Sequence, residues 1–126
     1  MNKKIIFTEN APKPVGPYNQ AVEANGFVYL AGQIPLDGSG KLVSENVSEQ
    51  TEQVFKNIQA VLTEAGCTLK SVVKASVFMK DLNDFAAMNE VYAKYFPADT
   101  APARSTFQVA KLPLDVRVEI EIIACK

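Results

Sequence analysis

The sequence predicts an α+β fold in which two helices pack on one side of a mostly antiparallel sheet. Two segments carry apolar residues at helical spacing, several short segments are rich in β-branched and aromatic residues, and the two kinds of segment are interleaved. The expected order is an N-terminal strand followed by β-β-α-β-α-β-β. Because a chain of 126 residues is long enough for one core and too short for two, we expect a single domain over residues 1–126.

The first half of the chain predicts a strand, a hairpin and a long helix. The strand covers Lys3 to Phe7, and the hairpin runs from Ala21 to Gly32. Asn25-Gly26 at the hairpin centre is the favoured pair for a type I′ turn, since both central residues need a positive φ. The helix is expected from about Val47 to Ala65, and Gly66 stands where a C′ glycine ends a helix. Its apolar stripe consists of Val47, Val54, Ile58, Val61, Leu62 and Ala65.

The second half predicts a strand, a second helix and two further strands. The strand from Val72 to Lys80 alternates, with Val73, Ala75, Val77 and Met79 expected on one face. The helix follows the N-cap candidates Asp81 to Asp84 and ends at Phe96-Pro97, because the residue before a proline avoids the α region. Its stripe consists of Phe85, Met88, Val91, Tyr92 and Tyr95. The remaining elements are a strand at Ser105 to Val109, a turn at Leu112 to Asp115 and a strand at Val116 to Ala124 that places Arg117, Glu119, Glu121 and Ile123 on one face.

The composition excludes several kinds of site. The chain has no histidine, which rules out imidazole metal sites and the usual Ser-His-Asp and Cys-His catalysis. Cys67 and Cys125 lack the spacing of a zinc site, so we expect free thiols and no metal. A net charge of −1 gives no positive field for nucleic acid, and no apolar run approaches the ~20 residues of a membrane span. With no secretory segment after Met1, we expect a cytoplasmic protein.

Four segments carry candidate functional side chains. The turn Gly16-Pro17-Tyr18 aims an aromatic hydroxyl in a fixed direction, or simply half-buries a tyrosine in a loop. Gly32 ends a strand, where glycine lets a ligand or another backbone come close or else forms a plain bulge. Arg104 starts an apolar strand and can fork onto a carboxylate, or it is a solvated edge side chain. One of Glu119 and Glu121 can act as a base if it is partly withdrawn from water, although most such strand carboxylates face solvent.

Six segments together resemble the signature segments of the Rid family, the YjgF-like reactive-intermediate deaminases. The resemblance covers nearly the whole chain in the expected order, and it is most specific where an Arg-Ser segment is followed by Val-Ala-Lys-Leu-Pro. The segments are Gly16-Pro17-Tyr18, Gly32-Gln33-Ile34-Pro35, Val77 to Phe85, Asn89 to Tyr92, Pro102 to Ser105 and Val109 to Pro113.

The resemblance implies a chorismate-mutase-like fold assembled as a homotrimer, with three sheets forming an inner barrel and a cleft at each subunit interface. It also implies hydrolysis of 2-imino acids, such as 2-iminopropanoate and 2-iminobutanoate, to 2-keto acids and ammonia. At the matching positions, Arg104 holds the substrate carboxylate, Glu119 orients the water, and Tyr18 and Asn89 belong to the pocket. We expect no cofactor, because imines already hydrolyse in water, and positioning with acid–base help of roughly 10²- to 10⁴-fold is enough.

Two positions depart from the family pattern. Many relatives have a cysteine where this chain has Thr106. Because the family role of that residue lies in backbone groups that face the substrate, we expect Thr106 to keep it. Many relatives also have a serine just before the glycine at position 32, where this chain has Ala31, so a hydroxyl contact with substrate is lost.

Two other functions stay open. The same intersubunit cleft could bind a small carboxylate and serve as a non-enzymatic regulatory or partner-binding module, since a fold does not settle a function. Ribonuclease or translation-inhibitor activity has been attributed to related proteins. The missing histidine and the near-neutral charge disfavour this second alternative.

Overall fold

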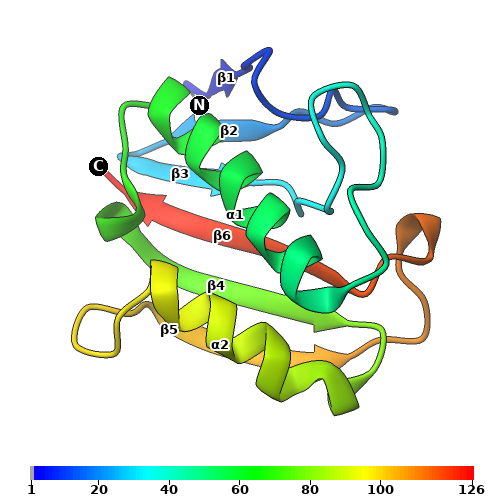
Figure 1. Ribbon diagram of the computed structural model, residues 1–126. Coiled ribbons are helices and arrows are strands. Elements are labelled where there is room, and N and C mark those ends of the chain that lie inside the picture. The colour runs from blue at the N-terminus through cyan, green and yellow to red at the C-terminus, as the bar shows by residue number, and fades with distance from the viewer. Residues whose placement is uncertain (1) are drawn as a thin grey trace.

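The computed structural model describes residues 2–126 and confirms the α+β class and the expected order of elements. In this part of the chain the strands form a mixed sheet in the order β1-β2-β3-β6-β4-β5, in which only β4 and β5 run parallel. Figure 1 shows α1 and α2 on the same face of this sheet. No helix within residues 2–126 is both long and apolar enough to cross a membrane. The strands are β1 (Lys4–Ile6), β2 (Ala21–Ala24), β3 (Phe27–Leu30), β4 (Val72–Met79), β5 (Ala103–Gln108) and β6 (Val118–Cys125).

The long helix α1 (Val47–Glu64) matches its prediction at both ends. Asn46 caps it by accepting a hydrogen bond on Oδ1 from the Glu49 N–H at 3.0 Å, and Gly66 follows it with a φ of 78°. The predicted stripe is buried along its whole length. Three polar side chains that the apolar spacing did not predict to be inside are buried with it: Gln50, Thr51 and Asn57.

The second helix, α2 (Phe85–Tyr95), follows the short 3₁₀ turn η2 (Leu82–Asp84). Met88, Val91 and Tyr92 are buried, as predicted. Phe85 was expected in the same buried stripe, and this expectation is wrong, because its ring is 37% exposed. It occupies the first turn of α2 and lies near Arg104 of β5, the last strand of the sheet.

Strand ends differ from the predicted ones by one or two residues, because a strand stops where its partner stops pairing. β5 begins at Ala103, so Arg104 lies inside the strand and not just before it. β6 begins at Val118, and Arg117 lies outside it. The Arg117 side chain turns toward the start of both helices and donates to Glu45 O at 2.7 Å and to Asp84 Oδ2 at 3.2 Å. The expectation that Arg117 shares a strand face with Glu119 is therefore wrong.

A bulge interrupts β4 at its start. Val72 pairs with Ala124 of β6 and Lys74 pairs with Ile123, so Val73 is left without a partner on β6. Val72 is buried and Val73 is 46% exposed. The expectation that Val73 shares the face of Ala75 is wrong, because the extra residue reverses the alternation at this point.

No helix or strand of residues 2–126 covers the face of the sheet opposite α1 and α2. Tyr29 of β3 and Phe107 of β5 point out from this face and are each nearly half exposed. Ile5 of β1 adds an exposed aliphatic side chain to the same face. An exposed apolar face of this kind is typical of an interaction surface.

Candidate active site

Arg104 lies under α2 and is held there by uncharged groups. It sits opposite Ala75 of β4, which is buried, so its side chain is on the face that the helices cover. Its Nη1 donates a hydrogen bond to Asn89 Oδ1 at 2.7 Å. The guanidinium carbon lies 4.6 Å from the ring centre of Tyr92 and 5.5 Å from that of Phe85. Both distances allow cation–π attraction, so the side chain is fixed in one orientation.

The Arg104 guanidinium has no carboxylate within ion-pair distance in residues 2–126. The ion pairs of this part of the chain are made by other cations. A guanidinium offers five N–H donors and meets a planar carboxylate with two of them at once. Because Asn89 accepts from Nη1, the other nitrogen atoms keep donors for an anion.

Two buried hydroxyl groups without hydrogen-bond partners belong to the same region. Thr106 lies two residues beyond Arg104, opposite buried Val77, and its Oγ1 is unpartnered. The Tyr92 hydroxyl is also unpartnered, and burial raises its pKa, an effect that Arg104 partly offsets. Buried polar atoms are nearly always hydrogen-bonded, so two hydroxyl groups without such a bond beside Arg104 single out this region of the structure.

Glu119 lies on the other face of the sheet. Its neighbours Val118 and Ile120 on β6 are buried beneath the helices, so the Glu119 side chain points away from them. It pairs with Phe78 of β4. Within one chain, the structure therefore brings Arg104 together with Asn89 and Thr106, but it does not bring Arg104 together with Glu119.

The Glu119 carboxylate packs directly against Gly32. A Cβ atom added to Gly32 would overlap Glu119 Oε2 and would lie 2.9 Å from Glu119 Cδ. The two residues are held in register by Gln33, whose N–H donates to Ile120 O at 2.8 Å. The expected close approach at Gly32 is present, but the approaching group is a side-chain carboxylate of the same chain and not a backbone.

A cavity of about 580 Å³ lies beside this carboxylate, and we call it the Glu119 cavity. Its volume is within the range of pockets that hold small ligands. Burial, reinforced by the neighbouring Glu121 carboxylate, raises the pKa of Glu119. A carboxyl group with a raised pKa exchanges protons nearer to neutral pH, as acid–base catalysis requires. The lining includes Tyr18, Gly32, Ile34, Leu36, Pro113, Leu114 and Glu119.

Tyr18 stands at the rim of the Glu119 cavity and is half exposed. Its N–H donates to Gly16 O at 2.9 Å, which closes a tight turn, and its hydroxyl accepts from the Val15 N–H at 3.4 Å. The hydroxyl proton remains available for a ligand. Ala31, which was predicted as a substrate-binding position, donates its N–H to Gln20 O at 2.9 Å but does not line the Glu119 cavity.

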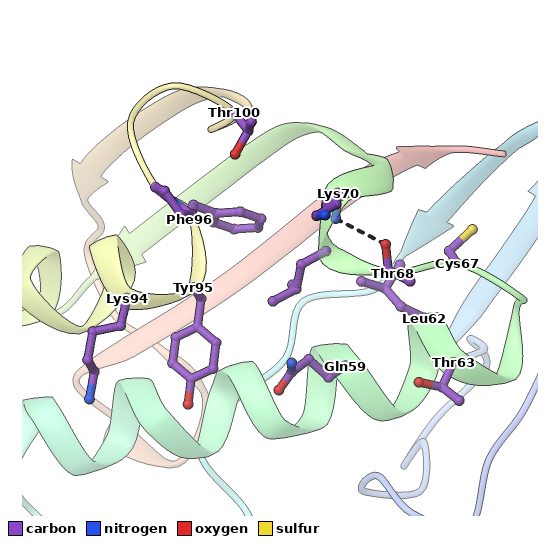
Figure 2. Close-up of a pocket in the computed structure, with 12 residues that line it drawn as sticks. Gln59, Leu62, Thr63, Cys67, Thr68, Lys70, Lys94, Tyr95, Phe96 and Thr100 are labelled. Atoms are coloured by element: carbon purple, nitrogen blue, oxygen red, sulfur yellow. Dashed lines mark hydrogen bonds between the residues drawn. The ribbon is translucent and has the colours of Figure 1, made fainter.

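A second cavity, of about 560 Å³, lies between the C-terminal halves of α1 and α2 (Figure 2). Several of its polar side chains already have partners. Lys94 pairs with Glu52 at 2.9 Å, and burial together with Glu52 raises the pKa of Tyr95 to about 12. Thr68 Oγ1 accepts from the Lys70 N–H at 3.2 Å, the dashed bond in Figure 2. The second cavity offers no acid–base pair, so we place the candidate site at Arg104 and in the Glu119 cavity.

Comparison with known proteins agrees with the resemblance. A family model described as Endoribonuclease L-PSP matches residues 8–126. A RutC family protein of Pyrococcus horikoshii is 54% identical over 98% of this chain and 98% of its own. The chain belongs to the Rid (YjgF) family. Another Rid protein, the 2-iminobutanoate/2-iminopropanoate deaminase of Salmonella typhimurium, is 46% identical over 98% of both chains. The crystal structure of E. coli TdcF with bound serine superposes with a TM-score of 0.91, at 42% identity and 98% coverage of both chains.

Two aromatic neighbours of Arg104 in this Rid protein were not predicted as site residues. Phe85 and Tyr92 were assigned to the core stripe, and Asn89 was the one residue of α2 assigned to the pocket. Spacings of four and three residues place all three side chains on one face of α2. That pattern of two aromatic rings around an amide could have indicated a place for a cation. Leu114, which lines the Glu119 cavity with a φ of 55°, had no comparable signal in the sequence.

Proposed function

We propose that this Rid protein hydrolyses 2-imino acids, including 2-iminobutanoate and 2-iminopropanoate, to 2-keto acids and ammonia. The observation that carries the proposal is Arg104, a partly buried guanidinium that Asn89 and Tyr92 hold in place and that has no carboxylate partner in residues 2–126. Such a group suits the carboxylate of a small acid. The name of the Salmonella relative and the serine bound to TdcF, itself a small amino acid with a carboxylate, support this substrate class.

The reaction uses one water molecule and no electron transfer. Water adds to the C=N carbon while the imine nitrogen takes up a proton. The tetrahedral intermediate then loses ammonia as its hydroxyl group becomes the carbonyl. Glu119, whose pKa burial raises, orients the water and transfers the protons, and Tyr18 offers a hydroxyl at the cavity rim. Backbone groups at Thr106 align the nitrogen, while Arg104 fixes the carboxylate.

We place this reaction at the boundary between two subunits of a homotrimer with a chorismate-mutase-like inner barrel. Arg104 and Glu119 face opposite sides of the sheet, so a single chain offers each group without the other. Val15 and Leu114 line the Glu119 cavity, and they are 89% and 69% exposed, as apolar residues at an open wall are. A neighbouring copy would close this wall and supply its own Arg104. Light scattering tests the assembly: three times the chain mass of 13.7 kDa supports it, and a monomer contradicts it.

Replacing Arg104 by alanine tests the proposed activity. Threonine dehydratase generates 2-iminobutanoate, semicarbazide traps what remains, and the slope of semicarbazone formation reports the loss of imine. We expect the wild type to accelerate this loss and Arg104→Ala to reduce kcat/KM by about 10²-fold, because the substrate is no longer positioned. Arg104→Lys keeps the charge without the planar fork, so an intermediate value is expected.

Lys94→Ala is the matched control for this experiment. Lys94 is also a cation and lies on α2, but it already has a partner, Glu52 of α1. Its loss should therefore leave imine hydrolysis unchanged. A wild-type protein that does not accelerate imine loss contradicts the proposed activity. Equal rates for wild type and Arg104→Ala contradict the role of Arg104.

The description of the family model favours a second candidate, a ribonuclease. We rank it below imine hydrolysis because the chain has no histidine and a net charge of −1. Salt-dependent cleavage of RNA by the purified protein would reverse this order. If the protein is instead a carboxylate-binding regulatory module, 2-keto acids should bind in an Arg104-dependent way, and imine loss should not be accelerated.

A further inference from the structure

The Glu119 cavity is bounded by two segments that are neither helix nor regular strand. Residues 8–18 form one wall and residues 31–40 form the other, and Figure 1 shows both segments at the same end of the sheet. Because these segments are not regular strands, their backbone N–H and C=O groups do not all pair with a neighbouring strand. Each buried group therefore needs another hydrogen-bond partner. In each wall, one almost fully buried side-chain amide supplies several of these partners.

Gln20 holds the first wall. Its side chain is 2% exposed, and its Oε1 accepts from the Thr8 N–H at 2.7 Å. Its Nε2 lies 3.1 Å from Thr8 O, 3.4 Å from Ala11 O and 3.0 Å from Pro12 O, and donates to these carbonyl groups. The Gln20 carbonyl accepts from the Ala31 N–H at 2.9 Å, which joins the first wall to the start of the second.

Asn57 of α1 holds the second wall through hydrogen bonds of its side chain. It lies on α1, is 1% exposed, and its Nδ2 donates to Ile34 O at 3.1 Å and to Leu36 O at 2.9 Å. Its Oδ1 accepts from Gln53 Nε2 at 3.0 Å, which fixes the orientation of the amide. Ile34 and Leu36 both line the Glu119 cavity and follow Gly32 closely in the chain. A hydrophobic side chain at position 57 would suit the helix stripe, but it would leave Leu36 O unpaired and Ile34 O with only the Leu36 N–H, which donates to it at 2.8 Å.

We propose that Gln20 and Asn57 are positioning residues of the active site, which hold the two walls so that the Glu119 carboxylate stays packed against Gly32 and shielded from bulk water. The inference rests on the proposed function and deepens it. Neither side chain is assigned a contact with the substrate. Each acts through the wall that its hydrogen bonds hold.

The pKa of Glu119 reports whether the walls are in place. Burial is the first cause of its raised pKa and the Glu121 carboxylate is the second. Within residues 2–126, the other ionisable side chains that line the cavity are Lys13 and Tyr18. In the proposed assembly the neighbouring copy adds its Arg104, whose charge is the same in the wild type and in the variants compared below. If a wall moves outward, water reaches the carboxylate and the Glu119 pKa falls toward its ordinary value. A substitution that only lowers global stability leaves this pKa unchanged in the molecules that remain folded.

The test compares Gln20→Met and Asn57→Leu with the control Gln50→Met. Gln50 is a fully buried amide of α1 with two backbone partners away from the cavity, the Arg117 N–H and Ser44 O, both at 2.8 Å. The Glu119 pKa is measured by NMR titration of protein carrying ¹³C-labelled glutamate, with Glu119→Gln to assign the signal. Imine hydrolysis is measured across pH in parallel.

In Gln20→Met and Asn57→Leu we expect a lower Glu119 pKa, a kcat/KM reduced by about tenfold and an acidic limb of the pH profile displaced to lower pH. Gln50→Met should change none of these. An unchanged Glu119 pKa in both test variants, or an equal fall in Gln50→Met, overturns the inference.

The titration separates this inference from the proposed function, because it needs no catalysis. A wild-type protein without imine hydrolysis would refute the proposed function, while the Glu119 pKa would still decide the role of the two amides. If a test variant does not fold, Gln20→Asn or Asn57→Ser takes its place, since these changes keep an uncharged polar side chain at the buried position. The same fall in the Glu119 pKa is then expected.

Discussion

At the scale of single residues, the candidate site depends on two charged groups in unusual surroundings. Arg104 lies against two aromatic rings and an amide, without an ion pair in residues 2–126. Glu119 is partly withdrawn from water and lies beside another carboxylate, Glu121. A carboxyl group with a raised pKa, such as Glu119, is typical of sites that bind or react. Arg104 is a cation without a carboxylate partner among the described residues, so both residues are direct targets for substitution.

Gly32→Ala separates the position of the Glu119 carboxylate from the stability of the fold. The added Cβ would overlap Glu119 Oε2 and would also lie 2.9 Å from Cδ and 3.1 Å from Cγ, so the flexible Glu119 side chain has to swing away. We expect kcat/KM to fall by about 10²-fold, since the carboxylate is displaced, and the free energy of unfolding to change by less than about 1 kcal/mol. Imine hydrolysis and urea unfolding measure the two quantities.

Gly38→Ala is the control, because it lies in the wall of the same cavity and a Cβ added there meets nothing within 4 Å. Its activity should match the wild type. Full activity in Gly32→Ala would show that catalysis does not require the carboxylate to stay against residue 32.

Glu119→Gln should stabilise the protein at neutral pH while abolishing its activity. The folded protein raises the Glu119 pKa above its ordinary value of 4.5, so the ionised side chain opposes folding at any pH above the raised pKa. Glutamine removes this unfavourable effect. The variant should therefore have the higher free energy of unfolding near pH 7, and the difference should disappear below about pH 4, where both states of the wild type hold the proton.

Urea unfolding at several pH values, at one fixed protein concentration, measures this difference. Glu90→Gln, at an exposed position in the middle of α2, is the control for the loss of a surface carboxylate. A Glu119→Gln protein that is less stable than the wild type at pH 7 would mean that the ionised carboxylate is stabilised in the native state.

At the scale of elements, the local patterns predicted the helices better than the strands. Apolar spacing and Gly66 are local signals within or next to α1, and its observed ends match the prediction. The ends of β5 and β6 moved by one or two residues because partner strands determine them, and the bulge at Val73 had no local signal. The parallel pairing of β4 with β5 follows from the crossover through α2, which the predicted strand–helix–strand order indicates.

The cap of α1 yields a prediction about stability alone. Asn46→Ala removes the oxygen that accepts from the Glu49 N–H, and we expect a loss of about 1 kcal/mol in the free energy of unfolding with unchanged imine hydrolysis. Urea unfolding and the coupled assay measure the two effects. Reduced activity in a fully folded Asn46→Ala protein would show that the start of α1 influences the site, contrary to this account.

At the scale of the whole molecule, the residues of the candidate site are divided between the two faces of the sheet. The sequence predicted the residues on both sides of it, but it could not show that Arg104 and Glu119 project from opposite faces of one sheet, because side-chain direction depends on register. Arg104 faces α2, and Glu119 faces the side that no element of the described chain covers. The proposed mechanism therefore requires two copies, one supplying the guanidinium and the other supplying the carboxylate.

Complementation between two inactive variants tests this requirement most directly. Arg104→Ala and Glu119→Gln chains are unfolded together, refolded as a mixture, and assayed for imine hydrolysis against each variant refolded alone. If each site takes Arg104 from one chain and Glu119 from its neighbour, random mixing of equal amounts restores about a quarter of the sites. We predict recovery of about that fraction of wild-type activity. A mixture no more active than the separate variants would contradict a site built from two chains.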